Sequence, residues 1–233
     1  IEKKDNIYFS TEKMFELSSK NNIIIFILDT FDTELFQKII DADPSVTDKL
    51  DGFTYYPDVV GSYPTTKGAL PQILSNVWYE NEEPFSKYIK KIWRDNRFWS
   101  YIKSREFDVR LLMMPVFISE SPFVDNLIIA TSFVSSYAKF GTIFFKLTFF
   151  RATPHVLKKY FWIYTGDFDK FRSVKMNNTE IYHDGNDIEF YNSLKSNKLS
   201  AQDNYNCFRF YHLNGAHGPF DINREIKRVQ RGS

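Results

Sequence analysis

Residues Asn22 to Asp29 read N-I-I-I-F-I-L-D, and this stretch decides the fold class. Four of the six residues from Ile23 to Leu28 are β-branched, and polar residues stand on both sides of the run. Such a run predicts a central strand of a parallel sheet, buried on both faces. Asp29 follows at the carboxyl end of this strand, where open α/β sheets bind their ligands.

The rest of the chain supplies helices and two further strands. Thr33–Ala42 is expected to be a helix with one apolar side, which gives the strand, loop and helix of an α/β unit. Phe107–Met114 and Cys207–Leu213 are predicted as the second and third strands. The other expected elements are helices at Thr11–Ser19, Pro84–Ile92, Phe98–Ser104, Phe133–Phe150, Pro154–Tyr164 and Asp187–Ser196, and a short strand at Phe53–Tyr56. Together they predict an α/β fold with a mostly parallel central sheet and helices on both faces.

A second informative stretch, Ser62–Asn76, reads S-Y-P-T-T-K-G-A-L-P-Q-I-L-S-N. Apolar residues recur at helical spacing from Leu70 onward, after residues that favour a tight turn. Thr65 and Thr66 therefore stand at a helix N-terminus, where free N–H groups and the helix dipole favour an anion. A hydroxyl that attacks a phosphate or sulfate ester needs this setting, and the structural alternative is an N-capping threonine.

The third predicted strand also ends in a polar loop, N-G-A-H-G-P-F from Asn214 to Phe220. Glycines near His217 keep its imidazole open for a ligand or a proton transfer. His212 lies inside the strand and is expected to pack. In a parallel sheet, Asp29, the Thr66 turn and His217 would fall on the same edge.

Composition limits the class of protein. The chain has 233 residues, 43% of them hydrophobic, and we expect one domain over residues 1–230. A formal net charge of +1 argues against nucleic acid as the main partner. The single cysteine, Cys207, excludes an intramolecular disulfide and is expected to be a buried small hydrophobe. No apolar run approaches the roughly 18 residues that a bilayer requires.

The two ends of the sequence suggest a piece of a longer protein. The chain begins with Ile1 rather than Met. Residues 231–233, Arg-Gly-Ser, are predicted to be a vector-derived tail. We therefore expect the chain to be excised from a larger parent, so the absence of targeting signals within it carries little information.

The order of these motifs resembles the alkaline phosphatase superfamily, in particular the sulfatase-like branch with phosphoethanolamine transferases and lipoteichoic acid synthases. Thr66–Pro71, T-K-G-A-L-P, is similar to the transferases' T-x-x-S-x-P, with Ala69 in place of the serine. Ile73–Asn76, I-L-S-N, resembles the L-L-T-G that follows a sulfatase nucleophile. The stretch H-L-N-G-A-H-G-P-F is similar to the family motif whose histidine corresponds to His217.

The resemblance implies roles for individual residues. Thr66 would be the catalytic nucleophile, Asp29 and Thr66 would be metal ligands, and His217 would bind the substrate phosphate or a second metal. Zinc or manganese is the expected ion, with calcium or magnesium as further options. Weaker candidates are Thr65 as a neighbouring hydroxyl, Lys67 as a phosphate contact or a solvated lysine, and Asp32, which a helix-capping role explains equally well.

The function implied by the resemblance is a metal-dependent transfer through a covalent phospho-threonine. A phosphoglycerol or phosphoethanolamine group would pass from a phospholipid to a cell-surface glycan. The parent would be anchored in a bacterial membrane, with this domain on the extracytoplasmic face. The family's later D-H-G motif, which supplies two further metal ligands, is absent from this sequence. We therefore expect an incomplete metal site and no activity from this piece alone.

Two alternatives remain at this stage. One is a sulfatase or phosphodiesterase that uses water as the acceptor. Against a sulfatase, the stretch Ser62–Thr66 resembles the start of the formylglycine motif but has threonine where that motif requires arginine. The other is a catalytically silent binding scaffold. In either case the aromatic insertion Phe133–Tyr164 would be a lipid-facing cover or a partner surface.

Overall fold

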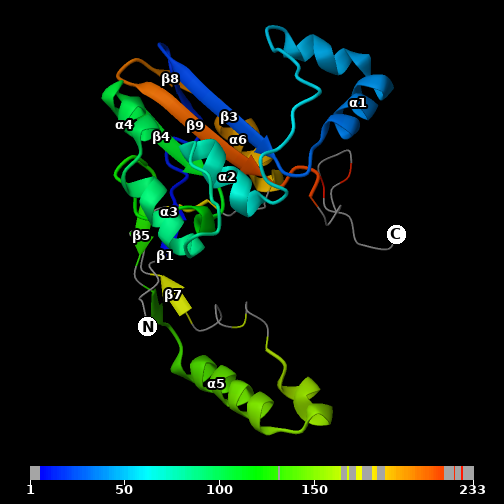
Figure 1. Cartoon of the computed structure of the whole chain (residues 1–233), viewed down its shortest axis with the longest axis vertical. Coiled ribbons are helices and arrows are strands. Elements are labelled where there is room, and N and C mark those ends of the chain that lie inside the picture. The colour runs from blue at the N-terminus through cyan, green and yellow to red at the C-terminus, as the bar shows by residue number, and fades with distance from the viewer. Residues whose placement is uncertain are drawn as a thin grey trace. The chain divides into compact units, whose positions relative to one another are not determined.

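The computed structural model describes residues 6–130, 132–163, 167, 172–174, 180–182, 187–217, 223 and 227. The chain is a mixed α/β structure with small, mostly parallel sheets (Figure 1). It divides into two compact units, which we describe separately. The first unit comprises Ile1–Tyr8 and Ile128–Thr179, and the second comprises Phe9–Leu127 and Glu180–Ser233. The single domain expected from the sequence stays a prediction.

The largest sheet of the second unit has three parallel strands in the order β3, β9, β4. These are β3 (Asn22–Leu28), β9 (Asn206–Leu213) and β4 (Phe107–Leu112), and they lie side by side in Figure 1. The strands predicted at Ile23–Leu28, Phe107–Met114 and Cys207–Leu213 are confirmed. They pair in parallel because each apolar run is separated from the next by helical segments long enough to return the chain.

The position of β3 in this sheet differs from the prediction. Among the described residues β3 pairs with β9 alone, and β9 occupies the centre of the sheet. Alternate side chains of β3 are consequently open, and Phe26 is 52% exposed. The prediction that Ile23–Leu28 is central and buried on both faces is therefore wrong. In β9 all residues from Cys207 to His212 are buried, although its mixed sequence N-C-F-R-F-Y-H-L gives a weaker apolar signal than β3 does.

Helices pack on both faces of β9. Phe208 contacts Trp99 of α4 (Arg97–Ser104), with ring centroids 5.1 Å apart. Tyr211 contacts Phe190 of α6 (Asp187–Asn197), at 5.3 Å. Because successive side chains of a strand point to opposite faces, residues 208 and 211 lie on different sides of the sheet. The sheet therefore has one side toward α4 and the other toward α6.

The predicted helices of the second unit are largely confirmed. They are α1 (Thr33–Ala42), α2 (Thr66–Ser75), α3 (Phe85–Arg94), α4 and α6. The described part of this unit also contains two short 3₁₀ helices, η1 (Pro44–Leu50) and η2 (Pro115–Phe117). The strand predicted at Phe53–Tyr56 does not form: these residues are exposed and form no ladder.

The helix predicted at Thr11–Ser19 is also wrong. The segment forms a turn followed by β2 (Glu16–Ser18), which pairs in parallel with β8 (Ser200–Gln202). Side chains of the three-stranded sheet donate hydrogen bonds to backbone carbonyls of this segment, which in a helix would accept from N–H groups of the same helix. Arg110 donates to the carbonyl of Glu12 at 2.7 Å, Tyr211 to that of Met14 at 2.6 Å, and Arg209 to that of Glu16 at 3.0 Å. Burial raises the pKa of Tyr211 to about 12, so its hydroxyl remains a donor.

The described part of the first unit contains a helical segment, one strand pair and most of another, whose end residues Phe9 and Leu127 belong to the second unit. β1 (Asn6–Phe9) pairs with β5 (Leu127–Ala130), and β6 (Ser132–Val134) pairs antiparallel with β7 (Arg172–Val174). The predicted helices Phe133–Phe150 and Pro154–Tyr164 correspond to α5 (Tyr137–Ala152) and the 3₁₀ helix η3 (His155–Phe161). Within the described ranges, no helix is long and apolar enough to cross a membrane.

A buried ionic network joins β4 to β9. The guanidinium of Arg209 is fully buried and lies 2.9 Å from Asp108 Oδ2, and Arg110 Nε donates to the same oxygen at 2.8 Å. Burial by itself would raise the pKa of Asp108. The hydrogen bond from Arg110 and the charges of Arg110 and Arg209 outweigh burial and hold this pKa below its ordinary value. Cys207, which lies on β9 with Arg209, is buried as predicted, and burial raises the pKa of its thiol.

We predict that Asp108→Asn lowers the free energy of unfolding at pH 7 by about 3 kcal/mol, because it leaves two buried cations uncompensated. Since the pKa of Asp108 is lowered on folding, its contribution is present above the ordinary carboxyl pKa of about 3.9 and is lost as pH falls below it. Urea unfolding between pH 7 and pH 3 measures both effects. As the pH is lowered, the free energy of unfolding should fall less steeply in the variant than in the native chain.

The matched control is Glu34→Gln, which removes an exposed ion pair with Lys38. It should cost less than about 0.5 kcal/mol. Equal losses in the two variants would contradict a stabilising role for the buried network.

Candidate functional site

The centre of the candidate site is a contact between Asp29 and Thr66. β3 ends at Leu28, and Thr30 has a positive φ of 53°, so the chain turns sharply directly after Asp29. Helix α2 begins at Thr66, and the Thr66 hydroxyl donates to Asp29 Oδ2 at 3.4 Å. The structure therefore brings together the two residues that the sequence predicted as a pair.

His212 is a third member of this cluster that the sequence analysis missed. Its imidazole is 4% exposed, and Nε2 lies 4.0 Å from Asp29 Oδ2. His212 is paired in register with Ile27, which precedes Asp29 by two residues. The side chains of His212, Ile27 and Asp29 therefore lie on the same side of the sheet. The expected packing role of His212 is consistent with its burial but omits this neighbour. The alternation of side chains along β9 could have placed His212 on the same side of the sheet as Asp29. That inference requires the register between β3 and β9, which the sequence does not give.

The backbone of Asp29 is fixed by the turn after β9. Its N–H donates to the carbonyl of Leu213 at 3.1 Å, and its carbonyl accepts from the N–H of Ala216 at 2.9 Å. Between these bonds lies Gly215, whose φ is +58°. A Cβ at Gly215 would lie 2.7 Å from the Asp29 carbonyl oxygen and 2.8 Å from its nitrogen, so this close approach requires glycine.

Asp187 holds the same turn from the other side. One carboxylate oxygen accepts from the N–H of Asn214 and the other from the N–H of Gly215, both at 2.8 Å. Asp187 is the first residue of α6 and resembles an ordinary acidic residue at a helix start. Nothing in the local sequence shows that it binds a turn 27 residues away, so the prediction missed it.

His217 lies in the turn that binds the Asp29 backbone. Its N–H donates to the carbonyl of Asn214 at 2.9 Å, and the residue is exposed. Its expected role in binding the substrate phosphate or a second metal stays a prediction. The residues of this motif that follow it, 218–220, lie outside the described residues, as does His183.

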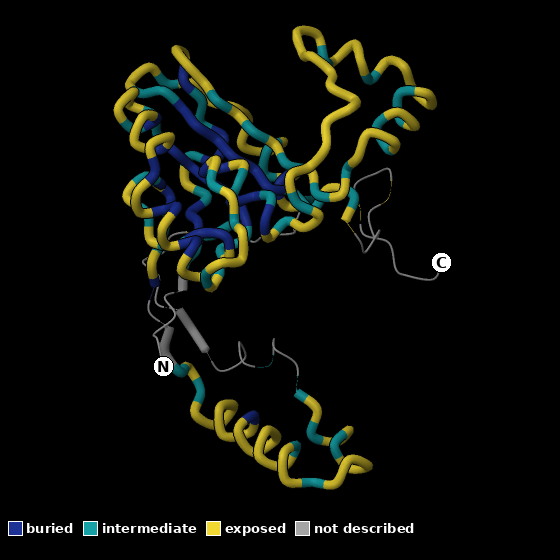
Figure 2. The backbone as a smooth tube through the Cα atoms, viewed as in Figure 1, coloured by how far each residue is buried: buried dark blue, intermediate teal, exposed yellow. Residues whose placement is uncertain are grey.

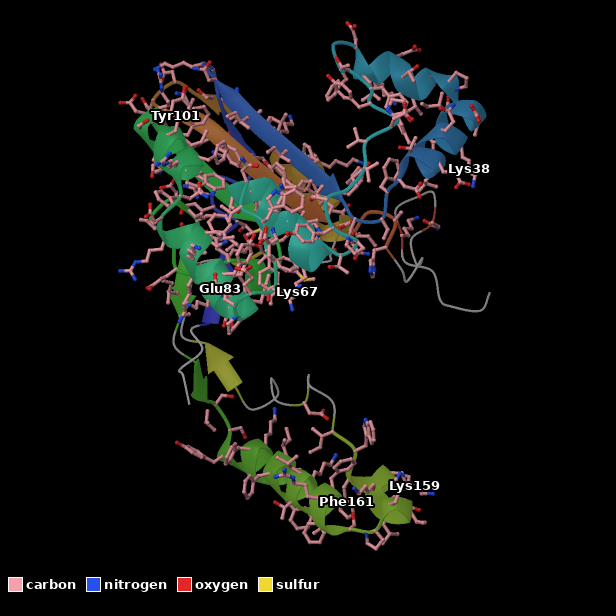
Figure 3. All side chains as sticks on the ribbon, in the orientation of Figure 1. Lys38, Lys67, Glu83, Tyr101, Lys159 and Phe161 are labelled. Atoms are coloured by element: carbon pink, nitrogen blue, oxygen red, sulfur yellow. The ribbon has the colours of Figure 1, made fainter. Side chains whose placement is uncertain are left out.

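The weaker candidates have structural partners. Asp32 caps α1, because its carboxylate accepts from the N–H of Leu35 at 2.8 Å. Thr65 is the N-cap residue of α2 but forms no side-chain cap hydrogen bond. Lys67, labelled in Figure 3, places its ammonium 4.8 Å from the ring centroid of Phe85, a cation–π contact.

The side chains around Asp29 include types that can bind a metal ion. A carboxylate, an imidazole and a hydroxyl converge, and zinc and manganese accept such ligands. In the portion of the chain that the structure describes, no group of three or more His, Cys, Asp or Glu residues is placed to hold an ion.

No protein-family model matches the chain, and neither a curated protein nor a solved structure matches it.

We predict that Gly215→Ala disrupts the Asp29 turn. The added methyl group would collide with backbone atoms that have no alternative position, so the free energy of unfolding should fall by several kcal/mol. Urea unfolding measures the change.

Gly52→Ala is the matched control, since Gly52 also has a positive φ, +84°, but has open space around its Cβ position. It should cost only about 1 kcal/mol. If both glycines tolerate alanine equally well, the close approach to Asp29 is not what holds the turn.

Proposed function

We propose that the protein contributes Thr66, Asp29 and His212 to a metal-assisted phosphoryl-group transferase that forms a covalent phospho-threonine at Thr66. The donor would be a phospholipid whose phosphoglycerol or phosphoethanolamine group passes to a glycan hydroxyl at the extracytoplasmic face of a bacterial membrane. The sulfatase-like arrangement of the sheet, with the site at the carboxyl ends of parallel strands, belongs to the same proposal.

The observation that carries this proposal is the 3.4 Å contact between the Thr66 hydroxyl and the Asp29 carboxylate. The two residues are 37 positions apart and come from different elements. Each occupies the place that its chemistry requires: Asp29 directly after a parallel strand, and Thr66 at the start of a helix. Within α2 the first N–H groups that donate to a helix carbonyl are those of Gly68 and Ala69, both to Thr65 at 3.1 Å. The N–H groups before them, at Thr66 and Lys67, are at the helix start, which favours the oxygens of a bound phosphate.

Asp29 and His212 would prepare the Thr66 hydroxyl for attack. Asp29 accepts the hydrogen bond from Thr66 and orients its lone pairs toward the phosphorus. His212, buried at 4.0 Å from the same carboxylate oxygen, would restrict the orientation of Asp29. A divalent ion bound by Asp29 and Thr66 would neutralise charge on the phosphoryl oxygens and favour the ionised hydroxyl.

The transfer balances in two displacements. In the first, Thr66 Oγ bonds to phosphorus, Asp29 takes the Thr66 proton, the bond from phosphorus to the diacylglycerol oxygen breaks, and water protonates that departing oxygen. In the second, a glycan hydroxyl attacks phosphorus and gives its proton to water, the bond from phosphorus to Thr66 Oγ breaks, and Asp29 returns the proton to Thr66. His217, exposed in the neighbouring turn, would bind the phosphate during both steps.

We predict that Thr66→Ala abolishes turnover of a chromogenic phosphodiester in the protein encoded by the whole gene, assayed with manganese or zinc. The loss in kcat/KM should be on the order of 10³-fold or more, because the nucleophile is removed. Asp29→Asn should show a comparable loss. Mass spectrometry of the native protein, quenched without an acceptor, should show the phosphoryl adduct on the peptide containing Thr66.

Two control variants make the assay specific. Thr66→Ser keeps a hydroxyl and should retain activity, and Thr65→Ala removes the neighbouring hydroxyl and should be close to native. Turnover that requires an added sugar acceptor supports a transferase, and equal turnover with water alone indicates a hydrolase. Full activity in Thr66→Ala would exclude the mechanism, and absence of both turnover and bound metal would favour a silent scaffold.

A further inference from the structure

The helical segment of the first unit exposes an unusual amount of apolar surface. We call α5 and η3 together with Trp162 the aromatic hairpin. Of the 16 residues of α5, only Ile143 is buried, and the tube in Figure 2 is exposed along nearly the whole helix. Exposed apolar surface of this extent indicates a site that a membrane or another molecule covers.

One side of the aromatic hairpin is covered by contacts between its own aromatic rings. Phe149 of α5 stacks on Phe161 of η3 with ring centroids 5.3 Å apart, and Phe150 meets the ring of Trp162 at 5.6 Å. Phe161 is labelled in Figure 3. These contacts hold η3 against α5, so the segment is a structured hairpin.

A different side of α5 carries an open apolar stripe. Tyr137, Phe140, Phe144 and Leu147 recur at spacings of three and four residues and therefore line one side of the helix. Tyr137 is 81% exposed and Phe144 is 61% exposed. Phe140 and Phe144 stack on each other at 6.1 Å, which gives the stripe a continuous surface.

The charge of the hairpin is entirely positive. No Asp or Glu occurs between residues 126 and 166, while residues 137–163 contain five cations: Lys139, Lys146, Arg151, Lys158 and Lys159. Because the whole chain has a formal charge of +1, the other residues sum to −4. The segment that exposes these aromatic residues therefore has a local charge excess of +5, while the rest of the chain is slightly acidic.

The lysines extend along the aromatic surface. Lys158 places its ammonium 5.1 Å from the ring centroid of Phe150, and Lys159, labelled in Figure 3, lies 5.1 Å from that of Tyr160. Lys139 and Lys146 are seven residues apart and share a side of α5 next to the apolar stripe. Such side chains can bury their carbon stems in an apolar layer and keep their charges at its polar boundary.

We propose that the aromatic hairpin docks onto the surface of a bilayer that contains anionic lipid, with the Tyr137–Leu147 stripe in the interfacial layer. A 16-residue helix with Lys146 near its middle is about 24 Å long, too short and too charged to span the membrane. Tyr137, Tyr160 and Trp162 combine an apolar ring with a polar group, as residues of the membrane interface do.

Charge complementarity selects this occupant. A second copy of the chain would bring five cations against five cations, which opposes self-association through this surface. Anionic headgroups are opposite in charge to all five cations, and each lysine near such a surface adds to binding. The proposal does not depend on Thr66 being a nucleophile.

The test is sedimentation of the whole chain with vesicles of phosphatidylcholine containing 50% phosphatidylserine, compared with pure phosphatidylcholine. Phosphatidylserine is chosen because its headgroup is neither of the proposed donor groups, so the candidate site does not account for its binding. We expect binding to the anionic vesicles that weakens in 1 M salt. Lys139→Gln/Lys146→Gln should reduce the partition coefficient about 30-fold, and Phe144→Ser/Leu147→Ser at least tenfold.

Matched controls alter equally exposed residues of the second unit. Lys20→Gln/Lys49→Gln and Tyr101→Ser/Leu199→Ser should bind vesicles as the native chain does, and circular dichroism should show that all variants are folded. Equal binding to neutral and anionic vesicles, or unchanged binding in both hairpin variants, would overturn the proposal. A dimer in sedimentation velocity that Phe144→Ser dissolves would also overturn it, in favour of a second copy as the occupant.

Discussion

The candidate site depends on the parallel pairing of β3 with β9. This pairing continues beyond the last residues of the strands, through hydrogen bonds from Asp29 to Leu213 and from Ala216 to Asp29. Gly215 allows the two backbones to approach to a distance that a Cβ would forbid. The position of the Asp29 carboxylate is therefore set by backbone geometry, and Thr66 and His212 meet it there.

The two faces of the same sheet serve different purposes. On one face, Arg209, Arg110 and Tyr211 capture carbonyls of the Glu12–Glu16 segment, and Asp108 compensates the buried charge. On the other face, His212 lies 4.0 Å from Asp29, which accepts a hydrogen bond from Thr66 at the start of α2. A buried ion pair contributes little net stability over apolar packing, but removal of one partner is costly. The network on the first face therefore constrains where β9, and so the site, can lie.

Sequence reasoning succeeded where local signals and tertiary structure agree. The apolar run before Asp29 and the capped, amphipathic helix Thr33–Ala42 have the predicted bounds within a residue. It failed where side chains from distant strands compete for the backbone, as at Thr11–Ser19. It also ranked β3 above β9 as the central strand, because Arg209 and His212 weaken the apolar pattern of β9, although both are buried.

By itself the sequence determined the α/β class, the three parallel strands, the start of the helix at Thr66 and the pairing of Thr66 with Asp29 as candidates. These follow from hydrophobic periodicity and from the chemistry of residues at strand and helix ends. Only the tertiary structure decided that β9 is central, that His212 joins Asp29, and that Asp187 fixes the turn of Gly215. These depend on strand order and register, which arise from contacts between residues far apart in the chain and leave no local pattern.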